Sequence, residues 1–201
     1  MQYKFKTKPY EHQLEALKRS WNKREYAYFM EMGTGKSKVL IDNIAILYDK
    51  GGIDAAIIVA PKGVYRNWSE KEIPAHMPEH IESQIAVWNP APTKAQKKEL
   101  VKLFESNHDL KILVINVEAF STKKGVTFVE KFILAHNPML AIDESTTIKN
   151  PKAQRTKNLL KLSINTKYRR ILTGFPVTRS PLDLYSQCSF LSPHLLGYAS
   201  Y

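Results

Sequence analysis

The stretch FMEMGTGKSKVL, residues 29–40, determines the fold that we expect for the whole chain. Two glycines, a lysine and a hydroxyl residue stand together between apolar residues, which is typical of a loop that binds phosphate. The usual pattern G-x-x-x-x-G-K-[ST] requires a glycine six residues before the lysine, and Met30 holds that position here. The stretch is therefore either a phosphate loop of a different lineage or a chance Gly-Thr-Gly turn.

The chemistry of such a loop assigns a role to each residue. Gly33 and Gly35 would let backbone N–H groups converge on phosphate oxygens, and the helix that follows adds a partial positive charge. Lys36 would reach the β- and γ-phosphates, and the hydroxyl of Ser37 would hold Mg²⁺. We therefore predict an ATP site that contains Gly33, Thr34, Gly35, Lys36 and Ser37. The alternative is a glycine turn with a surface lysine.

Apolar runs and amphipathic segments alternate along the whole chain. Most of the apolar runs are continuous, as in AAIIVA at residues 55–60, which indicates a mostly parallel sheet with helices on both faces, an α/β fold. Such sheets bind ligands at the carboxyl ends of their strands. The predicted strands cover residues 26–30, 55–60, 84–88, 111–117, 139–143 and 168–174, and the predicted helices cover 11–21, 36–50, 64–72, 93–106, 126–136, 152–162 and 181–191.

An acidic pair follows the apolar run MLAID at residues 139–143. Asp143 and Glu144 stand at the predicted carboxyl end of a strand, where two adjacent carboxylates are costly unless they serve a cation or a reaction. Asp143 would hold Mg²⁺ through a water molecule, and Glu144 would orient the attacking water, so we predict Lys36, Asp143 and Glu144 as catalytic residues. The alternative is a strand-to-helix turn in which an acidic or hydroxyl residue caps the next helix.

The composition limits the possible compartments and partners. The formal charge of +11 favours polyanionic partners, and residues 146–182 contain nine Lys or Arg and no acidic residue. This segment is either a solvated basic face or a site for nucleic acid. Cys188 is the only cysteine, no apolar run could span a membrane, and the first ten residues lack the apolar core of a signal peptide. We expect a cytoplasmic protein without membrane contact.

The motifs, taken in order, resemble the first RecA-like lobe of superfamily-two helicases, and within them the Swi/Snf-like DNA translocases. The resemblance covers nearly the whole chain, so residues 1–201 are expected to form one lobe. In that lineage an acidic-Met pair precedes the first loop glycine, and Glu31-Met32 matches it, so Met30 would end the strand. The matching segments are KPYEHQLEAL, EMGTGKS, IIVAPKGVYRNWSEK, ILVINVEAF, IDESTTIKNPKAQRTK, LTGFPV and SPLDLYSQCSFLSPHLLG.

The resemblance implies further roles for individual residues. Gln13 would read the edge of adenine, and Thr173 and Gly174 would couple ATP hydrolysis to nucleic acid. Trp68 would either stack on a base or pack in the core. The residues expected on nucleic acid are Lys62, Arg66, Asn67, Lys149, Asn150, Lys152 and Arg155.

The chain also departs from the family pattern. Ser145 and Thr146 replace Ala-His of the D-E-A-H motif, and Phe175 replaces a small residue of L-T-G-T-P. Nothing in the chain resembles the second RecA-like lobe, which would supply an arginine finger, so we expect this lobe in cis or on a partner chain. An arginine finger contributes roughly 10³–10⁵ in turnover, and the isolated lobe is therefore expected to be nearly inactive.

Three functions remain open from the sequence. The first is the ATP-binding motor lobe of a Swi/Snf-like translocase acting on duplex or branched DNA, with RNA as a further possible substrate. The second is a non-catalytic, nucleotide-gated module that binds nucleic acid or protein. The third function is a small-molecule kinase. It leaves two segments unexplained, KPYEHQLEAL around Gln13 and ESTTIKN at residues 144–150. A compact Swi/Snf-like protein would suit a bacterium or a phage-infected host cell.

Overall fold

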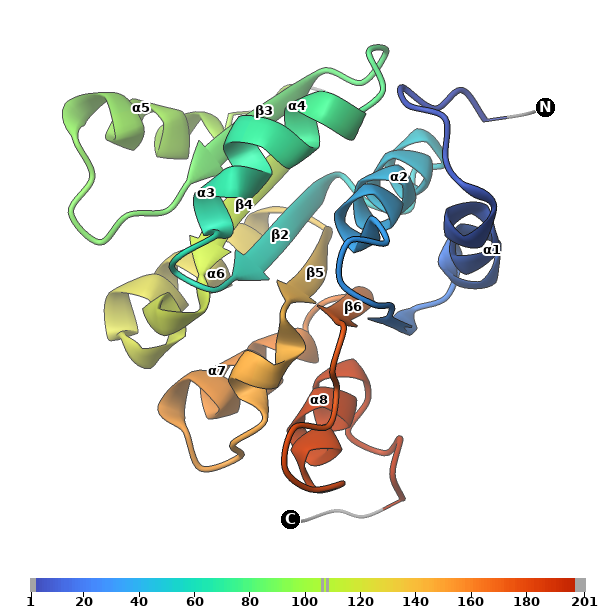
Figure 1. Ribbon diagram of the computed structural model, residues 1–201. Coiled ribbons are helices and arrows are strands. Elements are labelled where there is room, and N and C mark those ends of the chain that lie inside the picture. Colours follow the sequence, from blue (N-terminus) through green and yellow to red (C-terminus); the bar gives the residue numbers. More distant parts are fainter. Residues whose placement is uncertain (1–2, 106, 108, 198–201) are drawn as a thin grey trace.

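A single parallel sheet organises the chain. The computed structural model describes residues 3–105, 107 and 109–197 (Figure 1). All five strand pairings are parallel, and the six strands follow the order β1-β6-β5-β2-β4-β3. The strands are β1 (Glu25–Phe29), β2 (Ala55–Ala60), β3 (Ser83–Val87), β4 (Leu110–Asn116), β5 (Pro138–Asp143) and β6 (Tyr168–Thr173). The predicted α/β class is confirmed.

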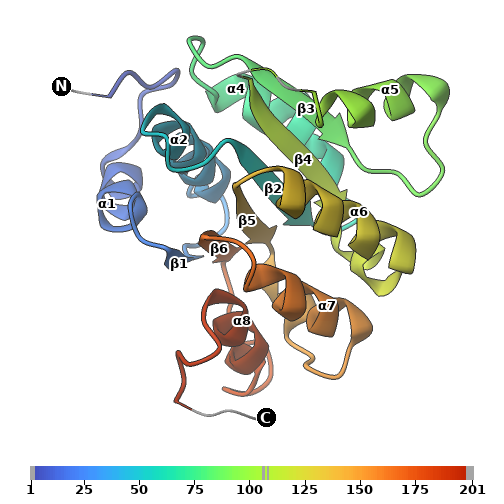
Figure 2. The ribbon, with the colours of Figure 1, turned by 180° about the vertical axis from the view of Figure 1, so that it is seen from behind.

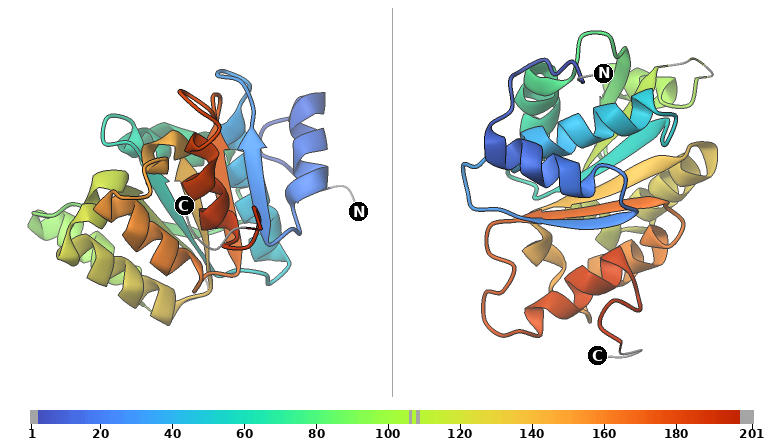
Figure 3. Two further views of the ribbon diagram at one scale, coloured as in Figure 1. Left: turned by 90° about the horizontal axis from the view of Figure 1, so that it is seen from below. Right: turned by 90° about the vertical axis from the view of Figure 1, so that its right-hand side faces the viewer.

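Helices cover both faces of this sheet, as the right panel of Figure 3 shows. The first face carries α1 (Glu11–Ser20), α2 (Lys36–Asp49) and the run of α3 (Tyr65–Asn67), η1 (Trp68–Glu72) and α4 (Ile73–His76). The second face carries α5 (Lys94–Lys102), α6 (Lys123–Ala135), α7 (Gln154–Ser163) and α8 (Asp183–Leu191), and in Figure 2 α6 and α7 lie in front of the sheet. Two short 3₁₀ turns, η2 (Val117–Ser121) and η3 (Ser145–Ile148), follow β4 and β5.

The continuous apolar runs follow from this layering. All six residues of β2 are fully buried, and their side chains alternate between the two cores. Ala56 and Ile58 pack with α2 on the first face, whereas Ile57 and Val59 pack with α6 and α7 on the second. Because both faces of the central strands are covered, no position in them needs a polar side chain.

The helix predicted for residues 64–72 continues to His76. The chain passes from α3 through one π-helical turn, η1, into α4, and Pro74 lies inside the last piece. In the π turn, the amide of Ile73 donates to the carbonyl of Trp68. Proline has no N–H group and its ring crowds the preceding turn, and the wider π turn accommodates it. The predicted end of this helix at residue 72 was therefore wrong.

Two of the cations counted in the basic segment belong to the interior. Arg170 is fully buried, and its guanidinium donates to Asn43 and to the carbonyls of Ser20, Lys23, Arg24 and Arg169. The neighbouring Arg169 donates to three carbonyls and pairs with Glu25. Neither arginine contributes to an exposed basic face. No described helix combines the length and the apolar character that crossing a membrane would require.

Candidate functional site

The predicted site residues meet at the carboxyl ends of β1, β6 and β5. The strand register places Phe29 opposite Thr173 and Asp143 opposite Leu172. Met30 extends the β1–β6 ladder by one bond, because its amide donates to the carbonyl of Thr173 at 3.3 Å. The sheet therefore brings together the glycine loop after β1, the acidic pair after β5 and the loop after β6, near the centre of Figure 1.

The glycine loop has the backbone conformation that only glycine adopts without strain. The φ angles of Gly33 and Gly35 are 79° and 82°, both in the left-handed region. Gly35 is also the N-cap of α2, and the hydroxyl of Thr34 donates to the carbonyl of Glu31 at 2.7 Å inside the turn. The loop therefore joins strand and helix as a phosphate loop does, with the helix N-terminus directed at the loop.

Lys36 lies within this loop. Its side chain is buried, and its ammonium donates to the carbonyls of Met30 and Glu31 at 3.0 Å each. Both acceptors are neutral, and within the described part of the chain no carboxylate lies at salt-bridge distance from this ammonium. Ser37 follows in the first turn of α2 and is half-buried. A buried cation beside a helix N-terminus is an arrangement that favours an anion.

Gln13 braces the loop from α1. Its Oε1 accepts from the amide of Tyr10 at 3.0 Å, and its Nε2 donates to the carbonyl of Thr34 at 3.0 Å. The contact is close, since a Cβ on Gly35 would lie 2.3 Å from Gln13 Nε2. His12 also reaches the carbonyl of Thr34, at 2.9 Å. Sequence reasoning missed this bracing role, and the adenine contact of Gln13 stays a prediction.

Asp143 is held by two hydrogen bonds. Its Oδ2 accepts from the indole Nε1 of Trp68 at 2.9 Å, and its Oδ1 accepts from the amide of Glu144 at 3.0 Å. Burial raises the pKa of Asp143 to about 6, the neighbouring charge of Glu144 adds to this rise, and the bond from Trp68 opposes it. A cation at Asp143 would favour the ionised carboxylate that burial disfavours.

The position of Trp68 settles one alternative. The side chain is 2% exposed and belongs to the core of the first face, so the core reading is confirmed and base stacking is wrong. Sequence reasoning did not foresee its bond to Asp143, which joins residues that are 75 positions apart. No local pattern carries such a contact.

Glu144 takes an uncommon backbone conformation. Its φ is 50°, and it is the only non-glycine residue with positive φ among residues 3–105, 107 and 109–197. This conformation costs a non-glycine residue about 1–3 kcal/mol, so the surroundings must hold it. The hydroxyl of Thr173 donates to Glu144 Oε2 at 3.2 Å, and the same hydroxyl accepts from the amide of Phe175 at 3.2 Å. Gly174 stands between Thr173 and Phe175 in the chain. A Cβ added at Gly174 would lie 3.4 Å from the side chain of Met32.

The residues at the site fit Mg²⁺ better than a transition metal. The hydroxyl of Ser37 and the carboxylate of Asp143 are hard oxygen ligands, and Mg²⁺ usually takes one or two protein ligands together with phosphate and water. Within the described ranges no three His, Cys, Asp or Glu gather in a way that could hold a metal by themselves. This donor set suits an ion that arrives with a nucleotide.

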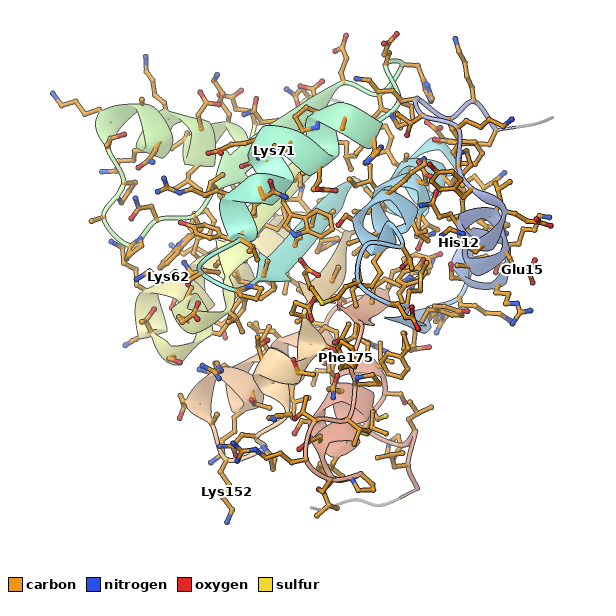
Figure 4. All side chains as sticks on the ribbon, in the orientation of Figure 1. His12, Glu15, Lys62, Lys71, Lys152 and Phe175 are labelled. Atoms are coloured by element: carbon orange, nitrogen blue, oxygen red, sulfur yellow. The ribbon has the colours of Figure 1, made fainter. Side chains whose placement is uncertain are left out.

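The residues expected on nucleic acid divide into two groups. Lys62, Arg66 and Lys152 are exposed, and Figure 4 shows Lys62 at the loop after β2 and Lys152 extending outward before α7. The others also make contacts within the chain: Asn67 donates to Glu72, Lys149 lies 3.8 Å from Asp183, Asn150 accepts from the amide of Lys152, and Arg155 donates to the carbonyl of Thr147. The second group therefore has structural roles in addition to any contact with a ligand.

Comparisons with known proteins agree with this geometry. CHR12 of Arabidopsis thaliana, described as a probable ATP-dependent DNA helicase, is 28% identical over 175 residues, which cover 83% of this chain and 14% of that protein. The chromatin-remodeling ATPase INO80 of Sclerotinia sclerotiorum is 28% identical over 171 residues, which cover 82% of this chain and 9% of that protein. This chain therefore spans less than a fifth of the length of these relatives.

Solved structures show the same fold. The SWI2/SNF2 ATPase core of Sulfolobus solfataricus, in complex with dsDNA, superposes with a TM-score of 0.75 at 22% identity, over 98% of this chain and 38% of that one. The UvsW helicase of bacteriophage T4 gives 0.63 at 12% identity, over 92% of this chain and 58% of that one. A family profile described as the SNF2-related domain matches residues 13–201, and the chain belongs to this family.

Proposed function

We propose that residues 1–201 form the ATP-binding motor lobe of a Swi/Snf-like translocase, which couples ATP hydrolysis to movement on DNA. The observation that carries this proposal is the bond from Thr173 to Glu144. It connects the acidic pair after β5 to the loop after β6, directly beside the glycine loop that holds Lys36. Nucleotide binding and a second region of the lobe can therefore influence one another through a single hydroxyl.

The side chains would share the work of hydrolysis. The glycine loop and Lys36 would hold the β- and γ-phosphates, while Ser37 and Asp143 would hold Mg²⁺. The cation would neutralise charge on the phosphate oxygens. Glu144 would orient the attacking water and accept its proton, since its carboxylate already lies at the strand end beside Asp143. Thr173 would keep that carboxylate in place.

A second RecA-like lobe would complete the site. The relatives are much longer than this chain, and we propose that a second lobe, in cis or on a partner chain, supplies the arginine finger. Without it, turnover would be lower by roughly 10³–10⁵. The isolated lobe would then bind ATP and hydrolyse it very slowly.

DNA is the proposed nucleic acid, either duplex or branched. The solved SWI2/SNF2 core from Sulfolobus solfataricus is in complex with dsDNA, which supports this choice, and RNA is the competing substrate in the test below. We propose the cytoplasm of a bacterial or phage-infected cell as the compartment. The two curated relatives come from a plant and a fungus and lend this placement no support.

Nucleotide binding is tested on the 201-residue chain. Lys36→Ala should abolish binding of a fluorescent ATP analogue while the circular-dichroism spectrum stays that of the folded protein, because the hydrogen bonds of the Lys36 ammonium to described residues go to two loop carbonyls and to no core side chain. Lys18→Ala, which removes an exposed cation from α1, is the matched control and should bind normally. Unchanged affinity in Lys36→Ala would remove the phosphate-loop assignment.

Turnover is tested on the protein together with its second lobe. ATP hydrolysis should be stimulated by DNA, and single-stranded, duplex and forked DNA and RNA are compared at one salt concentration. Glu144→Gln should retain ATP binding and lose hydrolysis. Normal turnover in that variant would show that Glu144 does not orient the water.

One observation favours the nucleotide-gated module instead. Both carboxylate oxygens of Asp143 already accept hydrogen bonds, Oδ2 from the indole of Trp68 and Oδ1 from the amide of Glu144, which makes them less available to Mg²⁺. A module of this kind would bind ATP and change its affinity for nucleic acid without hydrolysis. ATP-dependent DNA affinity combined with no turnover, even with the second lobe present, would decide for it.

A further inference from the structure

A second polar link joins the turn after β5 to the loop after β6, and it lies outside the site described above. Ser145 and Gln187 are both fully buried, and the hydroxyl of Ser145 donates to Gln187 Oε1 at 2.6 Å. Gln187 stands on α8, 42 residues away in sequence. Its Nε2 donates to the carbonyl of Pro176 at 2.8 Å and to the carbonyl of Asp183 at 2.8 Å.

Together with the bond from Thr173, this link closes a ring. Glu144 accepts from Thr173, whose hydroxyl accepts from the amide of Phe175. The chain continues to Pro176, whose carbonyl accepts from Gln187, and Gln187 accepts from Ser145, the residue directly after Glu144. A movement at one side of the ring must therefore strain or break a bond at the other.

The ring also explains how Glu144 is held in its left-handed conformation. Asp143, the residue before it, is fixed by Trp68, and Ser145, the residue after it, is fixed by Gln187. Both neighbours of a strained residue are thus anchored to other elements, η1 on one side and α8 on the other. Contacts of this kind on both sides can hold Glu144 in a backbone conformation that costs free energy.

Hydrogen bonds to its backbone hold the loop between β6 and α8 in place, while apolar side chains of the loop are exposed. Asp183 accepts from the amides of Thr178 and Arg179 at 2.9 and 2.8 Å, and Gln187 holds Pro176. Phe175 is nevertheless 65% exposed, and Figure 4 shows it near the centre of the face that carries the strand ends. A contact made by this side chain would act on a loop that the ring connects to Glu144.

We propose that Gln187 is a positioning residue for Glu144, which transmits the position of the loop at Phe175–Pro176 to the hydrolytic carboxylate through Ser145. The proposal deepens the function proposed above and rests on it. Stability alone gives little reason for this pair, because two apolar side chains of similar volume would fill the same space without burying a hydroxyl and an amide. The hydrogen bond between these two side chains instead fixes the position of α8 relative to the turn after β5.

The first test follows the ring directly by amide hydrogen exchange in the 201-residue chain. Ser145→Ala removes one hydroxyl and leaves the contact from Gln187 to Pro176. We expect faster exchange at the amide of Phe175, whose acceptor is Thr173, and unchanged exchange at the amides of Thr178 and Arg179, which Asp183 holds. Ser189→Ala is the matched control on α8, since its hydroxyl donates only to the carbonyl of Tyr185.

The second test separates positioning from stability in the protein with its second lobe. Ser145→Ala and Gln187→Leu are each expected to lower the DNA-stimulated kcat by about tenfold while KM for ATP stays within about twofold. The double variant leaves no unpaired hydroxyl or amide within this pair, but the carbonyl of Pro176 still loses its donor, so its melting temperature should recover only in part toward that of the wild type, whereas its kcat should stay low. Ser189→Ala should match the wild type in both.

Three outcomes would overturn the proposal. The first is unchanged exchange at the amide of Phe175 in Ser145→Ala. The second is a double variant that recovers kcat together with its melting temperature, which would make the pair structural only. The third is a KM for ATP that changes by as large a factor as kcat in Ser145→Ala and in Gln187→Leu. A wild-type protein without DNA-stimulated turnover would instead contradict the proposed function, and the exchange experiment would still decide on the ring.

Discussion

The hydroxyl of Thr173 donates to the carboxylate of Glu144 at 3.2 Å, and it accepts from the amide of Phe175 at the same distance. One oxygen atom thus connects the end of β6, the acidic pair after β5 and the exposed loop that follows. A hydroxyl can do this because it donates and accepts at once.

Replacing this hydroxyl should uncouple hydrolysis from nucleic acid. In Thr173→Val the shape is preserved, but the carboxylate of Glu144 loses a donor and the amide of Phe175 loses an acceptor. We expect kcat in the presence of DNA to fall about tenfold or more, with ATP affinity changed less than about twofold. Thr173→Ser retains the hydroxyl and serves as the control. A Thr173→Val enzyme that DNA stimulates normally would exclude this coupling role.

The close contact between Gln13 and the glycine loop leads to a second prediction. Gly35→Ala should be more destabilising than Gly33→Ala, although both glycines have φ near 80°. A Cβ at Gly33 meets nothing within 4 Å, whereas a Cβ at Gly35 would lie 2.3 Å from Gln13 Nε2. Strain in the backbone costs each variant about 1–3 kcal/mol, and the clash adds to it only at Gly35.

Chemical denaturation of the two variants measures the difference. Adding Gln13→Ala should relieve the extra cost in Gly35→Ala and leave Gly33→Ala unaffected, because only the former contacts Gln13. Equal unfolding free energies for the two glycine variants would show that the contact yields without cost.

Much of this architecture could be predicted from local patterns. Continuous apolar runs such as Ala55–Ala60 identified the buried strands, and the glycine loop and Asp143–Glu144 were placed at strand ends because parallel strands present those ends on one edge. The positive φ of Gly33 and Gly35 explains why glycines stand at these two positions, and their contact with phosphate stays a prediction. These features depend on residues that are neighbours in the chain.

The features that sequence reasoning missed depend on residues far apart. Trp68 reaches Asp143, Arg170 reaches Asn43, and Ser145 reaches Gln187, over 75, 127 and 42 positions. A residue type does not reveal which distant partner it meets, so Arg170 was counted as part of a basic segment although it is buried. The continuation of the helix from residue 72 to His76 was missed for a different reason, because a π turn is not visible in an apolar pattern.

The first turns of α2 contain a buried ion pair that leads to a third prediction. Lys38 Nζ lies 2.7 Å from Asp42 Oδ2, and both side chains are almost fully buried. Asp42 Oδ1 finds no hydrogen-bond partner among the described residues, and burial raises the pKa of Asp42 from 3.8 to about 6 despite the bond from Lys38. Between about pH 4 and pH 6 the folded state therefore takes up a proton that the unfolded state does not bind.

The sign of the pH effect follows from this difference. The contribution of Asp42 to stability is fully present below about pH 4 and is lost as the pH rises through about 6. Relative to Asp42→Asn, the wild type should therefore be more stable at pH 4 than at pH 7 by about 2 kcal/mol. Asp143 titrates in both proteins, so its effect cancels in the difference. A constant difference from pH 4 to pH 7 would contradict the raised pKa.

The exposed cations of the predicted nucleic-acid face lead to the last prediction. Binding of DNA to the 201-residue chain should weaken steeply with salt, because contacts from lysine and arginine to phosphates release counterions. Lys152 is exposed and extends from the turn before α7. Lys152→Ala should lower the slope of log affinity against log salt by about 0.7–0.9, the value for one phosphate contact, and it should do so equally for different DNA sequences.

The salt dependence of DNA binding should depend on where the charge of Lys152 lies and not only on the net charge of the chain. Lys131→Ala removes an exposed cation of the same type from α6 and changes the net charge by the same amount, so it is the matched control. If DNA follows the strand ends and the turn before α7, Lys131→Ala should keep the wild-type slope while Lys152→Ala lowers it. Fluorescence anisotropy of labelled duplex DNA across a salt series measures both. Equal slopes for the two variants would mean that DNA responds only to net charge, and a flat salt response in the wild type would remove the backbone contact altogether.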